Sequence, residues 1–585
     1  MPEEKASIFT KADLNMESYI KGILLPYLGI SAVLFIVIGF ITRILPVARS
    51  LRVLMFLIPI VLVVYAVAYP YIVADSKKIS INSKMPYFIT YFAVLSTSEM
   101  GRSDLISILS KDPKLGAIAS ELKKVHTLVN KLHLAMPEAF RFLARRTPSR
   151  MFADFLDRLA YSLDSGVDLK DYLFQEQKTV MDDYETFYEG ALYDLDVFKE
   201  IYESIIISVV FIASFIIIGP IITGMDIGRM GLYALLMIIA AEVGVLLVIK
   251  FRMPEDPIWA DSKGIRDPKR EHIKMAAIYS GIGTVILTLA YFLFIRQRFT
   301  IPEPFVVAIV LTPFYYLGMV VDKEEKRIFR KDENFPAFIR SLSSSLAASG
   351  ASLVLVLKYL SAHDFGSLTD DIKALYRRLA IRVDRDRAWD FFIAGTGSWL
   401  IGIFSEIFRE SLRMGAEPDY VGLVISRNFE RIVRLRRKRQ QSIASFIGII
   451  YGLTGGAFAF ALAASFQVAV SINNLFSQMD LGAASNYIGG DIIHVIPPTG
   501  MTFLMYIMLT MMILHSLLSS LVIKLADGGH VLGSARYFVI LAWIFAVGMY
   551  LGQTLMARMM GTGGESSAGG AAQLVGGYLL GGVMP

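Results

Sequence analysis

Cysteine is missing from the whole 585-residue chain. Its absence excludes disulfide bonds, thiolate metal sites and cysteine nucleophiles. Histidine is also rare, and its seven residues are scattered along the chain instead of standing at metal-ligand spacing. We therefore expect no metal site and no bound cofactor.

The common catalytic motifs are missing as well. The chain has no G-x-x-x-x-G-K-S/T phosphate loop, no H-E-x-x-H zinc motif and no G-x-S-x-G nucleophile elbow. Without the phosphate loop, the chain is not expected to hydrolyse nucleotides by that route. We predict that the protein is not an enzyme and has no catalytic residues. An intramembrane enzyme is an alternative that no group of residues supports.

Charged residues make up only 19% of the chain, whereas soluble proteins contain about a quarter. Hydrophobic residues make up 55%, and they gather in uncharged runs of roughly 20 residues, the length of a bilayer-crossing helix. The sequence therefore predicts an all-α, polytopic membrane protein with about nine transmembrane helices. The predicted spans are 22–42, 53–73, 203–223, 230–249, 275–295, 302–321, 442–470, 500–523 and 537–557.

Two long polar segments, 74–200 and 322–441, interrupt the spans. An even number of predicted spans lies between them, so they share one side of the membrane. Lys and Arg concentrate on that side, notably in the short loop 250–274, whereas the loop 471–499 contains neither. By the positive-inside rule we expect both polar segments to be cytoplasmic and the C-terminus to be extracellular.

These features divide the chain into six segments. The predicted segments are an N-terminal segment with spans one and two (1–73), a first cytoplasmic helical bundle (74–200), four spans around the short loop (201–321), a second, basic cytoplasmic helical bundle (322–441), spans seven to nine (442–557) and a Gly-rich C-terminal tail (558–585).

The two polar segments resemble each other. The stretch "MPYFI" (85–89) matches "FPAFI" (335–339) at an offset of 250 residues. At an offset of 249, "LDSGVD" (163–168) matches "LRMGAE" (412–417), Phe155 falls on Phe404, and Gly101 falls on Gly350. We expect each repeated glycine to end a helix at the same point. A nearly constant offset predicts two homologous copies of one helical bundle.

Glu242 is the most obvious charge within a predicted span, in "LLMIIAAEVGVLLVI". A carboxylate inside the membrane suggests a function such as a proton relay. The simpler interpretation is that Glu242 lies near the cytoplasmic third of the span and pairs with a polar group on a neighbouring helix. His515 is a candidate for that partner.

Four small residues lie four apart on one face of the seventh span: Ala444, Gly448, Gly452 and Gly456. Small residues at this spacing allow two helices to approach closely. The pattern predicts tight helix packing, either within the chain or in a homodimer, and we expect a homodimer.

Basic residues concentrate in the second polar segment, which has 22 Lys and Arg against 16 Asp and Glu, whereas the first has 17 against 19. Two runs, "YRRLAIRVDRDR" (376–387) and "RNFERIVRLRRKRQQ" (427–441), carry the excess. One interpretation is anchoring to anionic membrane lipid, and another is an electrostatic dock for an acidic protein. Nucleic acid is not expected as a partner, because aromatic residues are not interleaved with the charges.

Taken together, the two bundles followed by spans, with the elements "SGASL", "SGVD" and "MGAE", resemble the type II secretion F-domain family. Its members are platform proteins of type II secretion systems, type IV pili, Tad pili and archaella. The nine spans and the four-span block 203–321 are most similar to the archaellum assembly platforms. The resemblance implies two partners, a cytoplasmic hexameric secretion or motor ATPase and pilin-like archaellin subunits. It also implies coupling of the ATPase to assembly and rotation of a filament.

On this resemblance, the basic runs of the second segment become candidates for docking the ATPase, because of their charge and position. The first cluster is Arg377, Arg378, Arg382, Arg385 and Arg387, and the second is Arg431, Arg434, Arg436 and Arg437. The second run enters the seventh span directly, so we interpret it as the end of a lever that joins the second bundle to the membrane.

Two further interpretations stay open. A platform of an archaeal adhesive type IV pilus, or of a type II-like secretion system, would have the same architecture. A transporter with regulatory cytoplasmic bundles would instead depend on Glu242 for solute flux.

Overall fold

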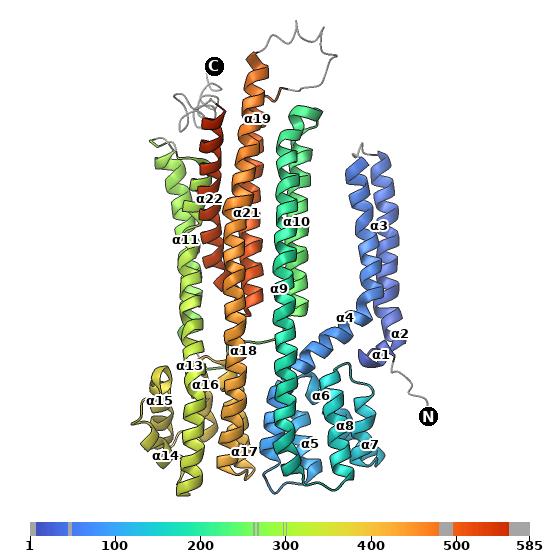
Figure 1. Cartoon of the computed structure of the whole chain (residues 1–585), viewed down its shortest axis with the longest axis vertical. Helices are drawn as coiled ribbons and strands as arrows, with labels where there is room; N and C mark the ends of the chain where they lie inside the picture. Colours follow the sequence, from blue (N-terminus) through green and yellow to red (C-terminus); the bar gives the residue numbers. More distant parts are fainter. Residues whose placement is uncertain are drawn as a thin grey trace.

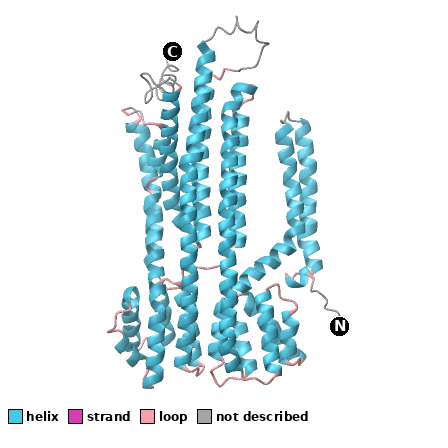
Figure 2. Cartoon of the chain, viewed as in Figure 1, coloured by secondary structure: helices cyan, strands magenta, loops and turns pink. Residues whose placement is uncertain are grey.

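The computed structural model of the chain describes residues 7–44, 49–260, 264–265, 268–296, 298–299, 301–478 and 495–560. Most of the Gly-rich tail, residues 561–585, lies outside them. Every regular element among the described residues is a helix (Figure 2). Among the described residues there is one isolated β-bridge, between Trp259 and Ser398.

Eight helices of the described chain are long and apolar enough to cross a membrane, and a bent pair that passes the same test together is a ninth candidate. The pair is α12 (Glu303–Leu311) and α13 (Phe314–Ser349), which meet at 45°. Pro313 stands at the break, where it lacks the backbone N–H that a continuous helix would need. Each predicted span therefore has its helix, and the sixth is in two pieces. The other spans lie in α3 (Leu25–Ile44), α4 (Arg49–Leu95), α9 (Leu169–Thr223), α10 (Ile227–Arg252), α11 (Pro268–Ala290) with η3 (Tyr291–Ile295), α18 (Pro418–Gly452) with η5 (Leu453–Ala459) and α19 (Phe460–Gln478), α21 (Pro498–Asp527) and α22 (Ser534–Met559).

Four of these helices, α4, α9, α13 and α18, continue out of the spans into the polar segments. The longest, α9, has 55 residues, which is about 80 Å at 1.5 Å per residue. The segment boundaries predicted near residues 201, 322 and 442 therefore fall inside helices. The side chains change from polar to apolar, or the reverse, at these points, but the helix continues through them. Both bundles lie at the same end of the spans (Figure 1).

Each bundle is completed by shorter helices. Those of the first bundle are α5 (Arg102–Lys111), η2 (Pro113–Leu115), α6 (Ala117–Leu132), α7 (Met136–Ala144) and α8 (Arg150–Asp164). Those of the second bundle are α14 (Leu353–Leu360), η4 (Gly366–Leu368), α15 (Thr369–Ala380), α16 (Arg385–Thr396) and α17 (Trp399–Arg413). Three short helices at the N-terminus, α1 (Ile8–Lys11), α2 (Met16–Tyr19) and η1 (Ile20–Leu24), precede the α3–α4 hairpin, and η6 (Val531–Gly533) precedes α22.

The predicted repeat is visible in the local geometry of the two bundles. Ser149 caps α8 and Ser398 caps α17, each accepting a hydrogen bond from the backbone N–H three residues later. Gly166 and Gly415 follow these helices with φ of 71° and 80°, in the left-handed region that glycine tolerates. The two copies therefore share helix starts and ends, not only an apolar pattern.

One repeated glycine does not behave as expected. Gly350 ends α13 with φ 55°, but Gly101 has φ −64° and begins α5. The first copy has already left its helix at Leu95, so Gly101 serves as an N-cap, where glycine is also common.

The two bundles share one apolar core. Tyr87 of α4 packs edge-to-face against Trp399 and Phe404 of α17, with ring centroids 5.0 and 5.7 Å apart. At the same junction, the buried Asn428 of α18 donates to Thr90 Oγ1 of α4 at 2.8 Å. Because these contacts are buried and lie in one core, the bundles pack as a single body.

Candidate functional site

The first candidate cluster forms a basic corner on the second bundle, between α15 and α16. Four of its arginines, Arg377, Arg382, Arg385 and Arg387, are exposed. The guanidinium of Arg378 lies 4.9 Å from the ring centre of Phe391 and is partly covered. Ile381 stands among them with 76% of its surface exposed. None of the five arginines forms an ion pair with any residue that the structure describes.

The local sequence explains why this corner projects. Arg377 and Arg378 fall in the last turn of α15, where the helix dipole favours cations. Arg382 then turns the chain with φ 60°, and Asp384 caps α16 by accepting from Arg387 N at 3.0 Å. Two close helix ends therefore present their arginines on one surface, which we call the basic corner.

The second candidate cluster, on α18, is mostly used inside the molecule. Arg431 Nη1 donates to Asp182 Oδ1 of α9 at 2.6 Å, and Lys438 pairs with Glu189 of the same helix. Arg437 donates to Glu333 Oε1 of α13 at 2.5 Å. Only Arg434 of the four candidates is exposed without an ion pair to a described residue. Much of this basic run therefore joins the two bundles.

Arg436 is wrongly placed in the predicted docking set. Its side chain is buried, with 3% of the residue exposed, and its Nε donates to Asp256 Oδ1 at 2.9 Å. Its Nη1 donates to Asp332 Oδ2 at 3.0 Å, and its Nη2 donates to Pro257 O at 3.0 Å. A partner protein cannot reach this guanidinium. Sequence spacing alone did not separate it from the exposed arginines because the run is basic nearly all round.

The carboxylates around Arg436 differ in their electrostatics. Burial opposes ionisation of Asp256, but the Arg436 guanidinium outweighs it and lowers the pKa of that carboxyl. Burial dominates at Asp332 and raises its pKa to about 6, even though Arg436 acts in the opposite direction. Asp332 also accepts from the cap Ser398, as its counterpart Asn82 does from Ser149 in the first bundle. We call Arg436, Asp256 and Asp332 the buried clamp.

The clamp fastens the loop between the fourth and fifth spans to the second bundle. Ala260 N donates to Gly397 O at 2.9 Å, and Trp399 N donates to Ile258 O at 3.0 Å. Trp259 Nε1 donates to Glu325 Oε1 at 3.2 Å. These hydrogen bonds therefore join the loop to the second bundle and to α13. The repeat could have identified Asp332 as a site residue, because Asp332 occupies the position that Asn82 has in the first copy. No sequence signal identified Asp256.

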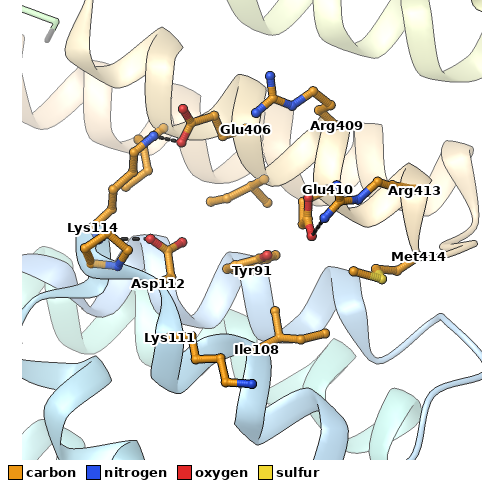
Figure 3. A pocket seen from close by; sticks show the side chains of 13 residues that line it. Tyr91, Ile108, Lys111, Asp112, Lys114, Glu406, Arg409, Glu410, Arg413 and Met414 are labelled. Atoms are coloured by element: carbon orange, nitrogen blue, oxygen red, sulfur yellow. Dashed lines mark hydrogen bonds and ion pairs between the residues drawn. The ribbon is translucent and has the colours of Figure 1, made fainter. Parts of the chain in front are cut away.

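A cleft of about 410 Å³ lies between the two bundles (Figure 3). Lys111, Asp112 and Lys114 line it from the first bundle, and α17 faces them across it. Lys114 pairs with Glu406 of α17 across the cleft. Burial raises the pKa of Tyr91, which also lines the cleft. Acidic and basic side chains are mixed here, so the cleft does not select a ligand of one charge.

Glu242 has the partner that the sequence suggested. Its Oε1 lies 2.6 Å from Nδ1 of His515 on α21, and both side chains are buried. The expectation that Glu242 pairs with a polar group on a neighbouring helix is confirmed.

The predicted small-residue face does not pack against any part of the chain that the structure describes. Ala444, Gly448, Gly452 and Gly456 are all exposed, and a Cβ on any of the three glycines would meet nothing within 4 Å. Close packing instead uses Gly455, whose carbonyl oxygen would lie 2.6 Å from a Cβ on Gly548 of α22. The intramolecular interpretation is wrong for this face, because a shift of one residue turns a helix by about 100°.

Comparisons with known proteins agree with the repeat. The family model "Type II secretion system (T2SS), protein F" matches twice, at residues 88–217 and 338–466. The chain is 38% identical to "Flagella accessory protein J" of Methanocaldococcus jannaschii, covering 95% of this chain and 98% of the relative. It is 36% identical to "Flagella accessory protein J" of Methanococcus voltae, covering 92% and 96%. No solved structure matches the chain. The chain therefore belongs to the family of Flagella accessory protein J, and it is a multi-pass membrane protein with two copies of the type II secretion protein F domain.

Proposed function

We propose that this chain is the membrane platform of an archaeal type IV pilus-like machine, the archaellum. In this role it couples a cytoplasmic hexameric motor ATPase to assembly and rotation of a filament of pilin-like subunits. Both bundles are cytoplasmic, and the opposite end of the spans is extracellular. The names and coverage of the relatives support the class of machine. The missing phosphate loop fits a protein whose energy comes from a partner.

The observation that carries the proposal is the continuity of α9 and α18 from the bundles into the membrane. These two helices are tied together beside the spans by Arg431–Asp182 and Lys438–Glu189. The shared core and the buried clamp then hold both bundles to the same spans. A force applied to the bundles is therefore transmitted to the spans along stiff helices, without an intervening flexible loop.

Within this function, the basic corner is the proposed ATPase dock. Its four exposed arginines surround the exposed Ile381, which is the pattern of charges around an apolar contact that protein interfaces use. Arg434 is a second exposed contact. Of the second cluster, Arg436 is excluded by burial.

Charge reversal tests the dock. We expect Arg377→Glu with Arg382→Glu to weaken binding of the purified motor ATPase at least about tenfold, since each reversal replaces attraction by repulsion. The matched control is Lys123→Glu with Lys131→Glu on α6, because both lysines are exposed and without an ion pair to a described residue. Binding should be measured in lipid nanodiscs at low and high salt. Equal affinity for the two double variants would overturn the dock.

The exposed small-residue face is the proposed homodimer contact. Three of its four members have open space around them, so the α18–α19 helix of a second copy can approach closely. We expect Gly448→Leu with Gly452→Leu to convert a dimer into a monomer. Gly244→Leu on α10 is the control, because Gly244 is also exposed with nothing within 4 Å. Native mass spectrometry gives the oligomeric state, and a wild-type monomer would refute the proposal.

An adhesive-pilus platform is the alternative within the same class. Deletion of the gene distinguishes the two, because loss of swimming filaments supports the archaellum and loss of adhesive pili alone supports the alternative.

A further inference from the structure

The α3–α4 hairpin stands apart from the other spans (Figure 1). Only 11% and 17% of the residues in the most apolar stretches of its two helices are buried, compared with 61% in α21. The apolar cores that the described residues build contain no residue before Ile81 of α4. The direction of the hairpin therefore depends on α4 itself, the helix that continues from the hairpin into the first bundle.

A proline interrupts the hydrogen bonding of α4 near the end of the second predicted span. Pro70 lies inside the helix and has no N–H, so the carbonyl of Ala66, four residues earlier, loses its usual helical donor. Prolines at such positions bend helices. Of the other two prolines of α4, Pro59 lies within the hairpin and Pro86 lies among core residues of the first bundle. Pro70 is therefore the hinge between hairpin and bundle.

Tyr19 supplies the donor that the proline lacks. Its hydroxyl donates to Ala66 O at 2.7 Å, and both residues are buried. The ring of Tyr19 also contacts those of Phe9 and Tyr69, with centroids 5.4 and 6.4 Å away. The carbonyl that Pro70 leaves free is thus satisfied from the N-terminal segment that precedes the hairpin.

The same segment is attached on the other side of the hinge through Asp13. The chain turns after α1, where Asp13 adopts φ 55°, and Asn15 begins α2 by accepting from Glu17 N at 3.1 Å. Lys124 Nζ of α6 lies 2.6 Å from Asp13 Oδ1. Lys77 of α4 also pairs with Asp13. The turn therefore joins the N-terminal segment to both α4 and the first bundle.

Glu121 of α6 completes a network of four charges. Its side chain is 1% exposed, and its Oε1 lies 2.6 Å from Lys77 Nζ and 2.8 Å from Lys124 Nζ. Each lysine thus binds both carboxylates. Partial burial opposes ionisation of Asp13, but the hydrogen bonds from Lys124 and Lys77 outweigh it and lower the pKa of that carboxyl. A connected network of this kind holds more firmly than an isolated surface pair.

We propose that residues 7–19 form a clasp that sets the angle of the α3–α4 hairpin at Pro70. Tyr19 holds α4 at Ala66, on the hairpin side of the proline, and Asp13 holds α4 at Lys77, on the bundle side. Bending at Pro70 changes the separation of these two attachments, and the short folded segment between Asp13 and Tyr19 opposes that change. A movement of the first bundle is therefore passed on to the hairpin.

The angle of the hairpin can be measured on the whole chain. Because the chain has no cysteine, spin labels on Ile36→Cys of α3 and Gly244→Cys of α10, both exposed, report one distance between the hairpin and the other spans. Pulsed EPR is recorded in lipid nanodiscs, with labelled chain diluted by unlabelled chain. We expect Asp13→Asn with Tyr19→Phe to broaden the distance distribution. An unchanged distribution would overturn the clasp, and this result is independent of filament assembly.

Glu17→Gln with Tyr65→Phe is the matched control. Glu17 forms an exposed ion pair with Lys21 in the same N-terminal segment. Tyr65 lies on α4, and its hydroxyl makes no hydrogen bond to a residue that the structure describes. This double variant should keep the wild-type distribution. Broadening equal to that of the clasp variant would show that any change in the segment has the same effect, and would refute the roles of Asp13 and Tyr19.

The hinge is tested separately by restoring the missing donor. In Pro70→Ala the alanine N–H can bond to Ala66 O within the helix. Tyr19→Phe should therefore broaden the distribution in the wild-type background but not in Pro70→Ala. Equal broadening in both backgrounds would mean that Tyr19 does not act at the proline, and the hinge would be refuted.

A second pair of labels shows that the effect is confined to the hairpin. Lys123→Cys on α6 and Arg385→Cys on α16 are exposed positions on the two bundles. Their distance should be the same in every variant. A change in this distance would show that the clasp holds the bundles together and not the hairpin angle, which would also overturn the proposal.

Discussion

Arg434 and Arg436 stand two positions apart in the same basic run, yet only Arg434 is exposed. Replacing Arg436 by Leu leaves Asp256 and Asp332 buried without their counter-charge. We therefore expect Arg436→Leu to lower the free energy of unfolding by about 3–5 kcal/mol. Arg434→Leu, at an exposed position, should change it by no more than about 0.5 kcal/mol.

Denaturant unfolding of both variants in one detergent measures this difference. Similar stabilities for the two would mean that water or relaxation compensates the buried carboxylates, and the clamp would then not fasten the loop to the second bundle.

Asp332 gives the clamp a pH dependence of known sign. It lies beyond the sixth predicted span, and its pKa rises from 3.8 to about 6 on burial. Between these values the folded chain binds more protons than the unfolded chain, so this carboxyl's contribution to stability falls as the pH rises. The contribution is complete below about pH 4 and is lost as the pH passes about 6.

Asp332→Asn removes this titration and serves as the reference. The melting temperature of the wild type minus that of the variant should decrease from about pH 4 to about pH 6 and stay level above about pH 7. A difference that rises over the same interval would show that Arg436, and not burial, dominates at Asp332.

Among whole elements, α22 packs closely against the α18–α19 helix at the glycines of both. A methyl group on Gly548 would lie 2.6 Å from Gly455 O and 3.0 Å from Ala459 Cβ. A backbone oxygen cannot move aside as a side-chain tip can. We therefore expect Gly548→Ala to lower the free energy of unfolding by about 1–3 kcal/mol.

Gly244→Ala is the comparison, because an added methyl there meets nothing within 4 Å. Thermal unfolding of the two variants in the same detergent should separate them clearly. Equal melting temperatures would mean that α22 shifts to accommodate the methyl group.

Hydropathy was sufficient to locate the eight candidate membrane helices and the bent pair, because the bilayer requires about 20 apolar residues in each span. Hydropathy could not predict where α4, α9, α13 and α18 end. A helix that passes from lipid into water changes its polarity there, but its backbone stays helical. The repeat offset correctly related α8 to α17, whose capping serines and terminal glycines depend on local sequence. The buried clamp could not be predicted, because Asp256 reaches Arg436 only through tertiary packing across 180 residues.

At the scale of the whole molecule, the bundles are expected to act as one body. Three kinds of contact join them: the shared aromatic core, the Asn428–Thr90 hydrogen bond and the Arg431–Asp182 ion pair. If force reaches the filament through α9 and α18 together, the bundles need not separate during a motor cycle. Their cleft is bridged by the Lys114–Glu406 pair, so a covalent link at that place should be harmless.

The cysteine-free chain permits this experiment without a background of native thiols. Lys114→Cys with Glu406→Cys, joined by a short bis-maleimide, should leave filament assembly and swimming at the level of the unlinked double variant. Each single variant treated with the reagent controls for simple modification. Assembly lost only in the linked protein would show that the bundles must part, and force would then pass through the cleft and not along the paired helices.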